Sequence, residues 1–409
     1  MKIGIFTNNY LPNPYGVTRS VETFRREFEK RGHEVYIFAP SWKGYEDKNP
    51  RVFRYPSIDI KIKFRFPLAI PYSWKLNKII DKLDLDIIHA QHPNLLGTVA
   101  MKWARKLACR RGRKIPLIFT WHTLYDQYTN FVPFVPSKIA SNYIIKKAVK
   151  FANLADAVIV PTDSIIPIIR KWGVKDCHPE FISGSNKEML KQVQHDRIYV
   201  IPTGVLEEEF ENADRNEIRK KYNIKDDKIV LLLVSRLTSE KNVEFIFRSM
   251  KDILKKDGVK FLVAGDGYLK PKLQDFCKKE GIEKKVIFCG EVERKEIKNY
   301  YCASDIFLYA SKSETQGMII TEAMYMGLPI VAVNATGINS LILNRGNGFL
   351  VSEDEKEFQS AVEKLIEGKD LREKFGEVSA RIAREKFTSS ICAEKMLEVY
   401  KEAIRRYKK

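Results

Sequence analysis

Short, nearly continuous apolar runs alternate along this chain with longer amphipathic stretches, and this rhythm limits the possible folds more than any other feature. The runs expected to form a first set of strands are residues 3–7, 35–39, 87–90, 117–121, 157–161 and 199–202. Helical patterns, such as those at residues 17–31 and 95–111, separate them. Strands that are apolar on both faces and separated by helices indicate a parallel sheet covered on both sides.

The same rhythm begins again in the second half of the chain. The second set of expected strands comprises residues 229–234, 261–264, 286–289, 306–309 and 330–333. The predicted fold class is therefore α/β, with two doubly wound, Rossmann-like domains. Ligands of open parallel sheets bind beyond the carboxyl ends of the strands. We therefore expect the two domains to face each other across one cleft that holds the chemistry.

The domain boundaries follow from this division. We expect an N-terminal domain at residues 1–205, a C-terminal domain at 206–385 and a final helix at 386–409 that crosses back to the N-terminal domain. The acidic residues 207–209 and the helical pattern after them are expected to link the domains. The change from one strand set to the other places the seam within residues 203–225.

Residues 175–197 interrupt the rhythm of the first domain. We interpret them as an inserted surface loop with a helical piece at 187–193. Cys177, His178 and His195 lie in this segment, but their spacing matches no standard metal site. The sequence therefore predicts no bound metal ion.

Composition limits the partners and the compartment. The 71 lysines and arginines exceed the 52 acidic residues, for a net charge of +19, which favours an anionic partner such as nucleic acid, acidic lipid or a phosphorylated ligand. The six cysteines form no C-x-x-C pair, and five lie in expected helices or strands as buried thiols. There is no signal-peptide core, and no apolar run approaches the roughly 20 residues that span a bilayer. We expect a cytoplasmic protein whose membrane contact is peripheral.

The strongest motif is the segment Ser-Glu-Thr-Gln-Gly-Met-Ile-Ile-Thr-Glu-Ala-Met, which follows the fourth expected strand of the second set and opens a helix. Its two carboxylates, Glu314 and Glu322, can accept paired hydrogen bonds from the vicinal hydroxyls of a sugar or ribose. The backbone N–H groups of Gln316, Gly317 and Met318 stand at a helix N-terminus, which favours phosphate. The alternative is an ordinary first-turn acid and a solvated loop acid.

Two cations follow the first strand of the second domain. Arg236 and Lys241 lie where they can neutralise a departing diphosphate, and the planar guanidinium and the compact ammonium can bind different oxygens. The alternative is a basic helix entrance in a basic protein.

Three further features are weaker. Gly265 and Gly267 flank Asp266 after a strand and can let the backbone approach a ligand, or simply form a strand-to-helix turn. Gly16 opens the first helix in a candidate phosphate or sugar loop, or in a structural turn. His122 stands at a strand's carboxyl end, where it can contact a ligand or serve as a structural histidine.

Together these residues resemble the retaining glycosyltransferases of the GT-B fold, specifically glycosyltransferase family four, and the resemblance covers nearly the whole chain outside the insert. The stretches at 16–24, 33–40, 86–93 and 122–125 look closest to diacylglycerol glucosyltransferases of bacterial membranes. This resemblance implies a donor bound through its diphosphate by Arg236 and Lys241. It also places the amides near Gly317 and the backbone at Gly16 against donor phosphate.

The resemblance also assigns the remaining contacts. Glu322 would bind the donor ribose, while Glu314 and His122 would contact the transferred sugar. Two positions depart from the family pattern: Leu206 stands where an aspartate is frequent, and Asn339 lies where many members carry a glutamate. The second departure weakens any assignment of ligand contacts to that turn.

The function expected from the resemblance is transfer of a hexose, with glucose from UDP-glucose the expected case, to a membrane lipid such as 1,2-diacylglycerol. No D-x-D metal site is recognised, so we expect transfer that requires no metal ion or prosthetic group. The choice between UDP and GDP donors stays open, as do soluble, phosphatidylinositol and polyprenyl-linked acceptors. A nucleic-acid-binding protein is the alternative of another class, but the chain lacks a recognisable reading module.

Clustered basic residues in the N-terminal domain favour contact with the anionic inner face of the cell membrane. The alternative is the solvated surface of a basic protein. The clusters are Lys102, Arg105, Lys106, Arg110, Arg111, Arg113 and Lys114; Lys61, Lys63 and Arg65; and Lys138, Lys146, Lys147 and Lys150.

Overall fold

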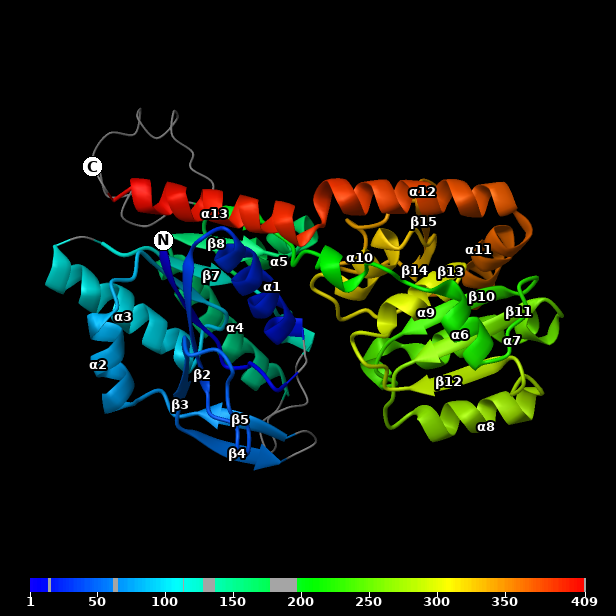
Figure 1. Cartoon of the computed structure of the whole chain (residues 1–409), viewed down its shortest axis with the longest axis horizontal. Coiled ribbons are helices and arrows are strands. Elements are labelled where there is room, and N and C mark those ends of the chain that lie inside the picture. Colours follow the sequence, from blue (N-terminus) through cyan, green and yellow to red (C-terminus); the bar gives the residue numbers. More distant parts are fainter. Residues whose placement is uncertain (14–15, 62–64, 113, 128–136, 177–196, 408–409) are drawn as a thin grey trace. The chain divides into compact units, whose positions relative to one another are not determined.

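The computed structural model of the chain describes residues 1–13, 16–61, 65–112, 114–127, 137–176 and 197–407 (Figure 1). The chain divides into two compact units. The first combines Met1–Thr203 with Cys392–Lys409, and the second comprises Gly204–Ile391.

The first unit is built on a parallel sheet. Its described strands follow the order β3-β2-β1-β6-β7-β8-β9, and each pairs with its neighbours in parallel. The carboxyl ends of these strands therefore share one edge. The strands are β1 (Lys2–Phe6), β2 (Glu34–Pro40), β3 (Val52–Tyr55), β6 (Ile87–Ala90), β7 (Leu117–Thr120), β8 (Ala157–Val160) and β9 (Ile198–Val200).

Helices and a small hairpin complete this unit. The hairpin pairs β4 (Ser57–Lys61) and β5 (Arg65–Ala69) in antiparallel register. The neighbouring helices α2 and α3 are joined by an ion pair between Asp81 and Arg110 (Figure 1). The helices are α1 (Gly16–Lys30), α2 (Trp74–Lys82), α3 (Leu96–Arg111), α4 (Ser137–Leu154), α5 (Ile166–Lys171) and α13 (Ser389–Arg405), with short 3-10 turns η1 (Tyr125–Gln127) and η2 (Asp163–Ile165).

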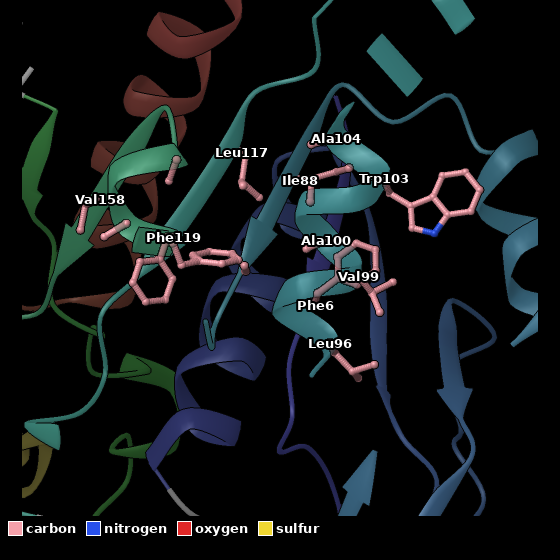
Figure 2. Packing of buried hydrophobic residues seen from close by; sticks show 14 of the residues in the cluster. Phe6, Ile88, Leu96, Val99, Ala100, Trp103, Ala104, Leu117, Phe119 and Val158 are labelled. Atoms are coloured by element: carbon pink, nitrogen blue, oxygen red, sulfur yellow. The ribbon is translucent and has the colours of Figure 1, made fainter. Parts of the chain in front are cut away.

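Both faces of the first sheet are buried. Along β1, Ile3 and Ile5 join one apolar cluster and Phe6 joins the other, as expected when successive side chains point to opposite faces. Figure 2 shows Phe6 and Phe119 of the sheet in the cluster that also contains Trp103 of α3. This two-sided burial explains why the strands are apolar throughout.

Helix α13 contributes to the opposite cluster. Its Met396 and Tyr400 are fully buried with Ile3 and Ile5 of β1. The Tyr400 hydroxyl lies 2.5 Å from Nδ1 of His89, whose Nε2 lies 2.7 Å from the Thr120 hydroxyl. From Cys392 onward, the end of the chain is thus part of the first unit.

The second unit repeats the architecture. Its described sheet has the order β12-β11-β10-β13-β14-β15, all parallel. Leu231 and Leu233 of the central strand face one apolar cluster, while Val230 and Leu232 face the other. The strands are β10 (Ile229–Val234), β11 (Val259–Ala264), β12 (Val286–Gly290), β13 (Ile306–Tyr309), β14 (Ile330–Val333) and β15 (Gly348–Val351).

The helical elements of the second unit precede, separate and follow these strands along the chain (Figure 1). They are η5 (Glu207–Glu209), α6 (Arg215–Lys221), η6 (Ser239–Lys241), α7 (Val243–Lys255), α8 (Lys270–Glu280), α9 (Ile297–Ala303), α10 (Met318–Tyr325), α11 (Glu355–Glu367) and α12 (Lys369–Lys386). Helix α6, which the sequence suggested as part of a linker, instead packs on α9 inside this unit.

The predicted fold class is confirmed: both units are Rossmann-like, with helices on both faces of a parallel sheet. Every predicted strand overlaps an observed one, whereas β3, β15 and the β4–β5 hairpin were missed. Residues 177–196, including Cys177 and the helix expected at 187–193, lie outside the described residues. The insert prediction was wrong for Arg197, which is 1% exposed and donates to the carbonyls of Ala152 and Ala155. Cys109 is exposed rather than buried.

Candidate active site

Two loops interlock where β10 and β11 end. A Cβ added to Gly265 would lie 1.9 Å from the Ser235 carbonyl oxygen, and one on Gly267 would lie 2.4 Å from that of Leu237. Only glycine permits so close an approach of backbone to backbone. The two glycines therefore seat the loop that carries Arg236, while their contact with a ligand remains a prediction.

Hydrogen bonds reinforce this arrangement. The Leu237 N–H donates to the Asp266 carbonyl over 2.9 Å. The Tyr268 hydroxyl donates to Ser239 Oγ over 2.7 Å and accepts from the Ser239 N–H over 2.9 Å. The neighbouring loop thus fixes the start of η6, and with it the position from which the Lys241 side chain extends.

Arg236 lies on the exposed side of this loop. One guanidinium nitrogen is 3.2 Å from the Glu240 carboxylate, and the two side chains are 45% and 41% exposed. Exposed ion pairs of this kind contribute roughly 0–1 kcal/mol. The guanidinium can therefore exchange this carboxylate for a more strongly charged anion at little cost.

Lys241 forms an ion pair with Glu314, and both side chains are largely buried. The Tyr309 hydroxyl, from the end of β13, donates to Glu314 Oε1 over 2.6 Å. Burial works to raise the pKa of Glu314, but the Lys241 ammonium and hydrogen bonds from Lys241, Tyr309 and Ser311 outweigh it and lower the pKa. The carboxylate is thus a charged acceptor at neutral pH.

The backbone at Glu314 is held by the turn at residues 335–337. Gly337 has a φ of +78°, and a Cβ there would lie 2.4 Å from the Glu314 carbonyl oxygen. The Ser311 hydroxyl also donates to the Glu240 carbonyl over 3.3 Å, which connects the Glu314 loop to η6. The carboxylate and the ammonium are therefore both placed by packed backbone.

Helix α10 begins directly after this loop. Gly317, with a φ of +69°, stands at its N-cap, and no side chain caps the helix there. Gln316 is buried beside it, and Met318 is the first helical residue. First-turn N–H groups at such an end favour a phosphate or carboxylate.

Glu322 lies one turn further along α10 and is only 4% exposed. Arg294 Nη1 donates to its Oε2 over 3.0 Å, and Nη2 forms an ion pair with Oε1 at 2.9 Å without making a hydrogen bond. The Tyr301 hydroxyl donates to the same carboxylate over 3.1 Å. Arg294 also donates to Glu209 over 2.7 Å. Arg294 was not among the residues predicted from sequence, since nothing in the run Glu-Arg-Lys-Glu distinguishes it from a solvated charge.

The structure therefore groups the predicted residues of the second unit into two contact sets at one sheet edge. Lys241 contacts Glu314, whereas Glu322 belongs with Arg294 and Tyr301. Their loops follow β10, β12 and β13, whose carboxyl ends share an edge because the sheet is parallel. Burial would lower the pKa of Arg294, but Glu322 and Glu209 outweigh it and raise the pKa.

The first unit carries the other two predicted residues. Gly16 is the exposed first residue of α1. His122 follows β7, and its Nε2 lies 2.7 Å from Gln91 Oε1. Burial, with smaller contributions from His92 and His89, lowers the pKa of His122 to about 3. The ring is therefore neutral at physiological pH and donates to Gln91.

Two further polar residues at this edge were not predicted. The Asn8 N–H, just after β1, donates to His92 Nδ1 over 3.1 Å, and Asn8 Oδ1 accepts from the Leu96 N–H over 3.0 Å. Burial lowers the pKa of His92 to about 4, so this ring is also neutral. Their positions after strand ends, like that of His122, were the available signal.

The described residues contain neither a cluster of metal-binding side chains nor a membrane-spanning helix. No group of three or more histidine, cysteine, aspartate or glutamate side chains there is arranged to hold a metal ion. No helix within those residues combines the length and apolar character needed to cross a bilayer.

Known proteins resemble this chain in both units. The description "Glycosyltransferase Family 4" matches residues 14–185, and "Glycosyl transferases group 1" matches 214–381. The alpha-monoglucosyldiacylglycerol synthase of Streptococcus pneumoniae is 32% identical, with 93% of this chain and 83% of that protein covered. The enzyme of the same name from Acholeplasma laidlawii is 27% identical, with 99% and 98% covered. The crystal structure of HepE from Anabaena in complex with UDP and glucose superposes with a TM-score of 0.73 at 18% identity, over 98% of this chain and 100% of HepE.

Two Rossmann-like units of this kind form the GT-B fold, and the families that match each of them are glycosyltransferases. The chain belongs to the group 1 and family 4 glycosyltransferases, and it is a hexosyltransferase.

Proposed function

We propose that this enzyme transfers glucose from UDP-glucose to 1,2-diacylglycerol at the inner face of the cell membrane, with retention of anomeric configuration. The observation that carries this proposal is the 32% identity, over nearly the whole chain, to an alpha-monoglucosyldiacylglycerol synthase. HepE, solved with UDP and glucose, supports a nucleotide-sugar donor. An α-linked product formed from an α-linked donor requires retention.

In this proposal Lys241 and Arg236 neutralise the donor diphosphate. An ammonium has three N–H donors, so Lys241 can keep its bond to Glu314 and still donate to a phosphate oxygen. Arg236 releases its exposed partner Glu240 and presents a planar fork to a second oxygen. Fixed cations aimed at the charge that develops on the leaving group lower the barrier without reorganisation, and no metal ion is needed.

Glu314 and the start of α10 receive the other parts of the donor. The charged Glu314 carboxylate accepts hydrogen bonds from hydroxyls of the hexose, as its lowered pKa allows. The N–H groups of Gln316, Gly317 and Met318 bind phosphate, and Glu322 accepts from the ribose. Gly265 and Gly267 keep the Arg236 loop close to the donor.

The first unit contributes Gly16, against the donor phosphate, and His122, against the sugar. His122 is neutral, so it binds a hydroxyl by hydrogen bonding rather than by charge. The same unit contacts the membrane through exposed cations, each of which adds roughly 1 kcal/mol against anionic lipid. Those on described surfaces include Lys102, Arg105, Lys106 and Arg110 of α3 and Lys146, Lys147 and Lys150 of α4.

The test is a product assay with the full chain. Radiolabelled UDP-glucose and GDP-mannose are each offered with diacylglycerol, phosphatidylinositol, a polyprenyl phosphate or a soluble sugar in mixed micelles. The proposal predicts a labelled glucosyldiacylglycerol from UDP-glucose. If the labelled product were mannosylated phosphatidylinositol, or formed only from a soluble acceptor, the proposed donor or acceptor would be wrong and the enzyme would catalyse a different glycosyl transfer.

A further inference from the structure

Arg294 lies in the turn between β12 and α9, yet its side chain contacts α10 and the segment at η5. Its Nη1 donates to Glu322 of α10 over 3.0 Å, its Nη2 lies 2.9 Å from the same carboxylate, and its Nε donates to Glu209 of η5 over 2.7 Å. Its guanidinium also lies 4.9 Å from the centre of the Phe210 ring. The planar fork therefore has little freedom to rotate.

The carboxylate that Arg294 holds is among the most buried acidic groups of the second unit. The Glu322 side chain is 6% exposed, against 30% for Arg294. A buried carboxylate without a cation is strongly disfavoured, whereas an arginine that lies against both oxygens and donates to one of them compensates the charge and restricts how the carboxylate can turn. The Tyr301 hydroxyl adds a third constraint on the same group.

Glu209 binds the same guanidinium through a different nitrogen. The guanidinium has five N–H donors, and the Glu209 carboxylate accepts from the one on Nε, while Nη1 and Nη2 face Glu322. Two acids and an aromatic ring thus hold one arginine in a single orientation. None of these partners is exposed enough to be displaced easily.

From this geometry we propose that Arg294 is a positioning residue for donor recognition: it orients the Glu322 carboxylate so that the oxygens accept hydrogen bonds from the hydroxyls of a nucleotide ribose. The inference rests on the proposed role of Glu322 in binding the donor. Arg294 itself does not contact the donor. Loss of Arg294 therefore weakens the contribution of the ribose hydroxyls specifically, rather than every donor contact equally.

The experiment compares nucleotides that differ only in ribose hydroxyls. Calorimetry gives the Kd of UDP or GDP, whichever the wild type binds more tightly, and of its 2′-deoxy and 3′-deoxy analogues. In the wild type, removal of the recognised hydroxyl weakens binding roughly tenfold or more, the usual worth of a hydrogen bond to a charged group. Arg294→Ala reduces that ratio to near one, and Arg294→Lys, which keeps the charge but not the fork, gives an intermediate ratio.

Three further variants separate positioning from general damage. Glu322→Ala removes the carboxylate itself, so the ratio of the Kd of the deoxy analogue to that of the parent nucleotide (the hydroxyl ratio) falls to one, which is the lower limit. Glu209→Gln keeps the fold but loosens the arginine, so the ratio falls part of the way. Arg384→Ala removes an exposed arginine that stacks on Tyr325 in the same unit and leaves the ratio at the wild-type value.

An unchanged hydroxyl ratio in Arg294→Lys and Glu209→Gln overturns the inference, even if Arg294→Ala fails to fold. A wild type indifferent to both ribose hydroxyls overturns it as well. The acceptor assignment fails separately, through the product assay, since nucleotide binding without transfer to diacylglycerol leaves the ribose ratios intact.

Discussion

The Lys241 ammonium is paired with the Glu314 carboxylate, although 73 positions separate them in the chain. They meet because β10 and β13 are adjacent in the sheet and each residue follows the carboxyl end of its strand. Without a donor, each group thus neutralises the other. When a donor binds, its diphosphate becomes a second anion for the ammonium, and its hexose offers hydroxyl donors to the carboxylate.

Replacing either partner should reduce turnover far more than stability. We expect Lys241→Ala and Glu314→Ala each to lower kcat about 100-fold or more, as loss of one preorganised charge does elsewhere. The double variant should be little worse than either single one, because the residues act as a unit. Steady-state kinetics with circular dichroism checks this.

The matched control is Lys312→Ala, which removes a lysine from an exposed ion pair with Glu353 in the same region. It should keep near-normal kcat. If Lys241→Ala and Glu314→Ala also kept near-normal kcat, the pair would have no part in the reaction.

Many of the candidate site residues could be predicted from sequence, because the sequence indicates where the buried strands end. Strands buried on both faces are apolar throughout, so β10 and β13 were recognised, and the polar residues after them became candidates. In contrast, β3 was missed because it lies at the sheet edge and carries Arg54 among its apolar residues. Arg294 could not be predicted, because its role depends on its proximity to Glu209 and Glu322, and these residues come close to it only in the folded chain.

A substitution at Gly265 should displace the loop that carries Arg236 and destabilise the protein. The added Cβ of Gly265→Ala would lie 1.9 Å from the Ser235 carbonyl, at a φ of +142°. We expect a loss of about 2–4 kcal/mol in the free energy of unfolding, typical of a buried clash added to backbone strain. Urea denaturation followed by fluorescence measures it.

Gly258→Ala separates clash from strain. Gly258 also has a positive φ, of +97°, but nothing lies within 4 Å of an added Cβ. It should cost only about 1 kcal/mol. Equal costs at the two positions would show that the contact with Ser235 does not constrain the loop.

The first unit should lose stability as the pH falls. Burial lowers the pKa of His89 from 6.5 to about 3, so between these values the unfolded chain binds a proton that the folded chain does not. The resulting stability is present above pH 6.5 and is lost as the pH falls toward 3, at up to about 1.4 kcal/mol per pH unit. Urea unfolding of the wild type at several pH values measures the slope.

His89→Asn provides the comparison. An amide keeps some of the hydrogen bonding to Tyr400 and Thr120 but does not titrate. The variant should be less stable near neutral pH and should show a shallower loss toward acid. A slope equal to that of the wild type would mean that His89 is not the proton acceptor.

Membrane binding should depend on the cations of α3 rather than on net charge alone. Lys102 and Arg105 are exposed on α3, and removing both in Lys102→Ala/Arg105→Ala should weaken binding to phosphatidylglycerol vesicles roughly 30-fold at low salt, from about 1 kcal/mol for each charge. High salt should narrow the difference, because it screens the charges that remain. Lys278→Ala/Lys279→Ala removes two cations that are also exposed, from α8 of the second unit, and should bind as the wild type does. Equal weakening by the two double variants in vesicle sedimentation would show that the protein is attracted by its overall charge and that α3 is not the contact surface.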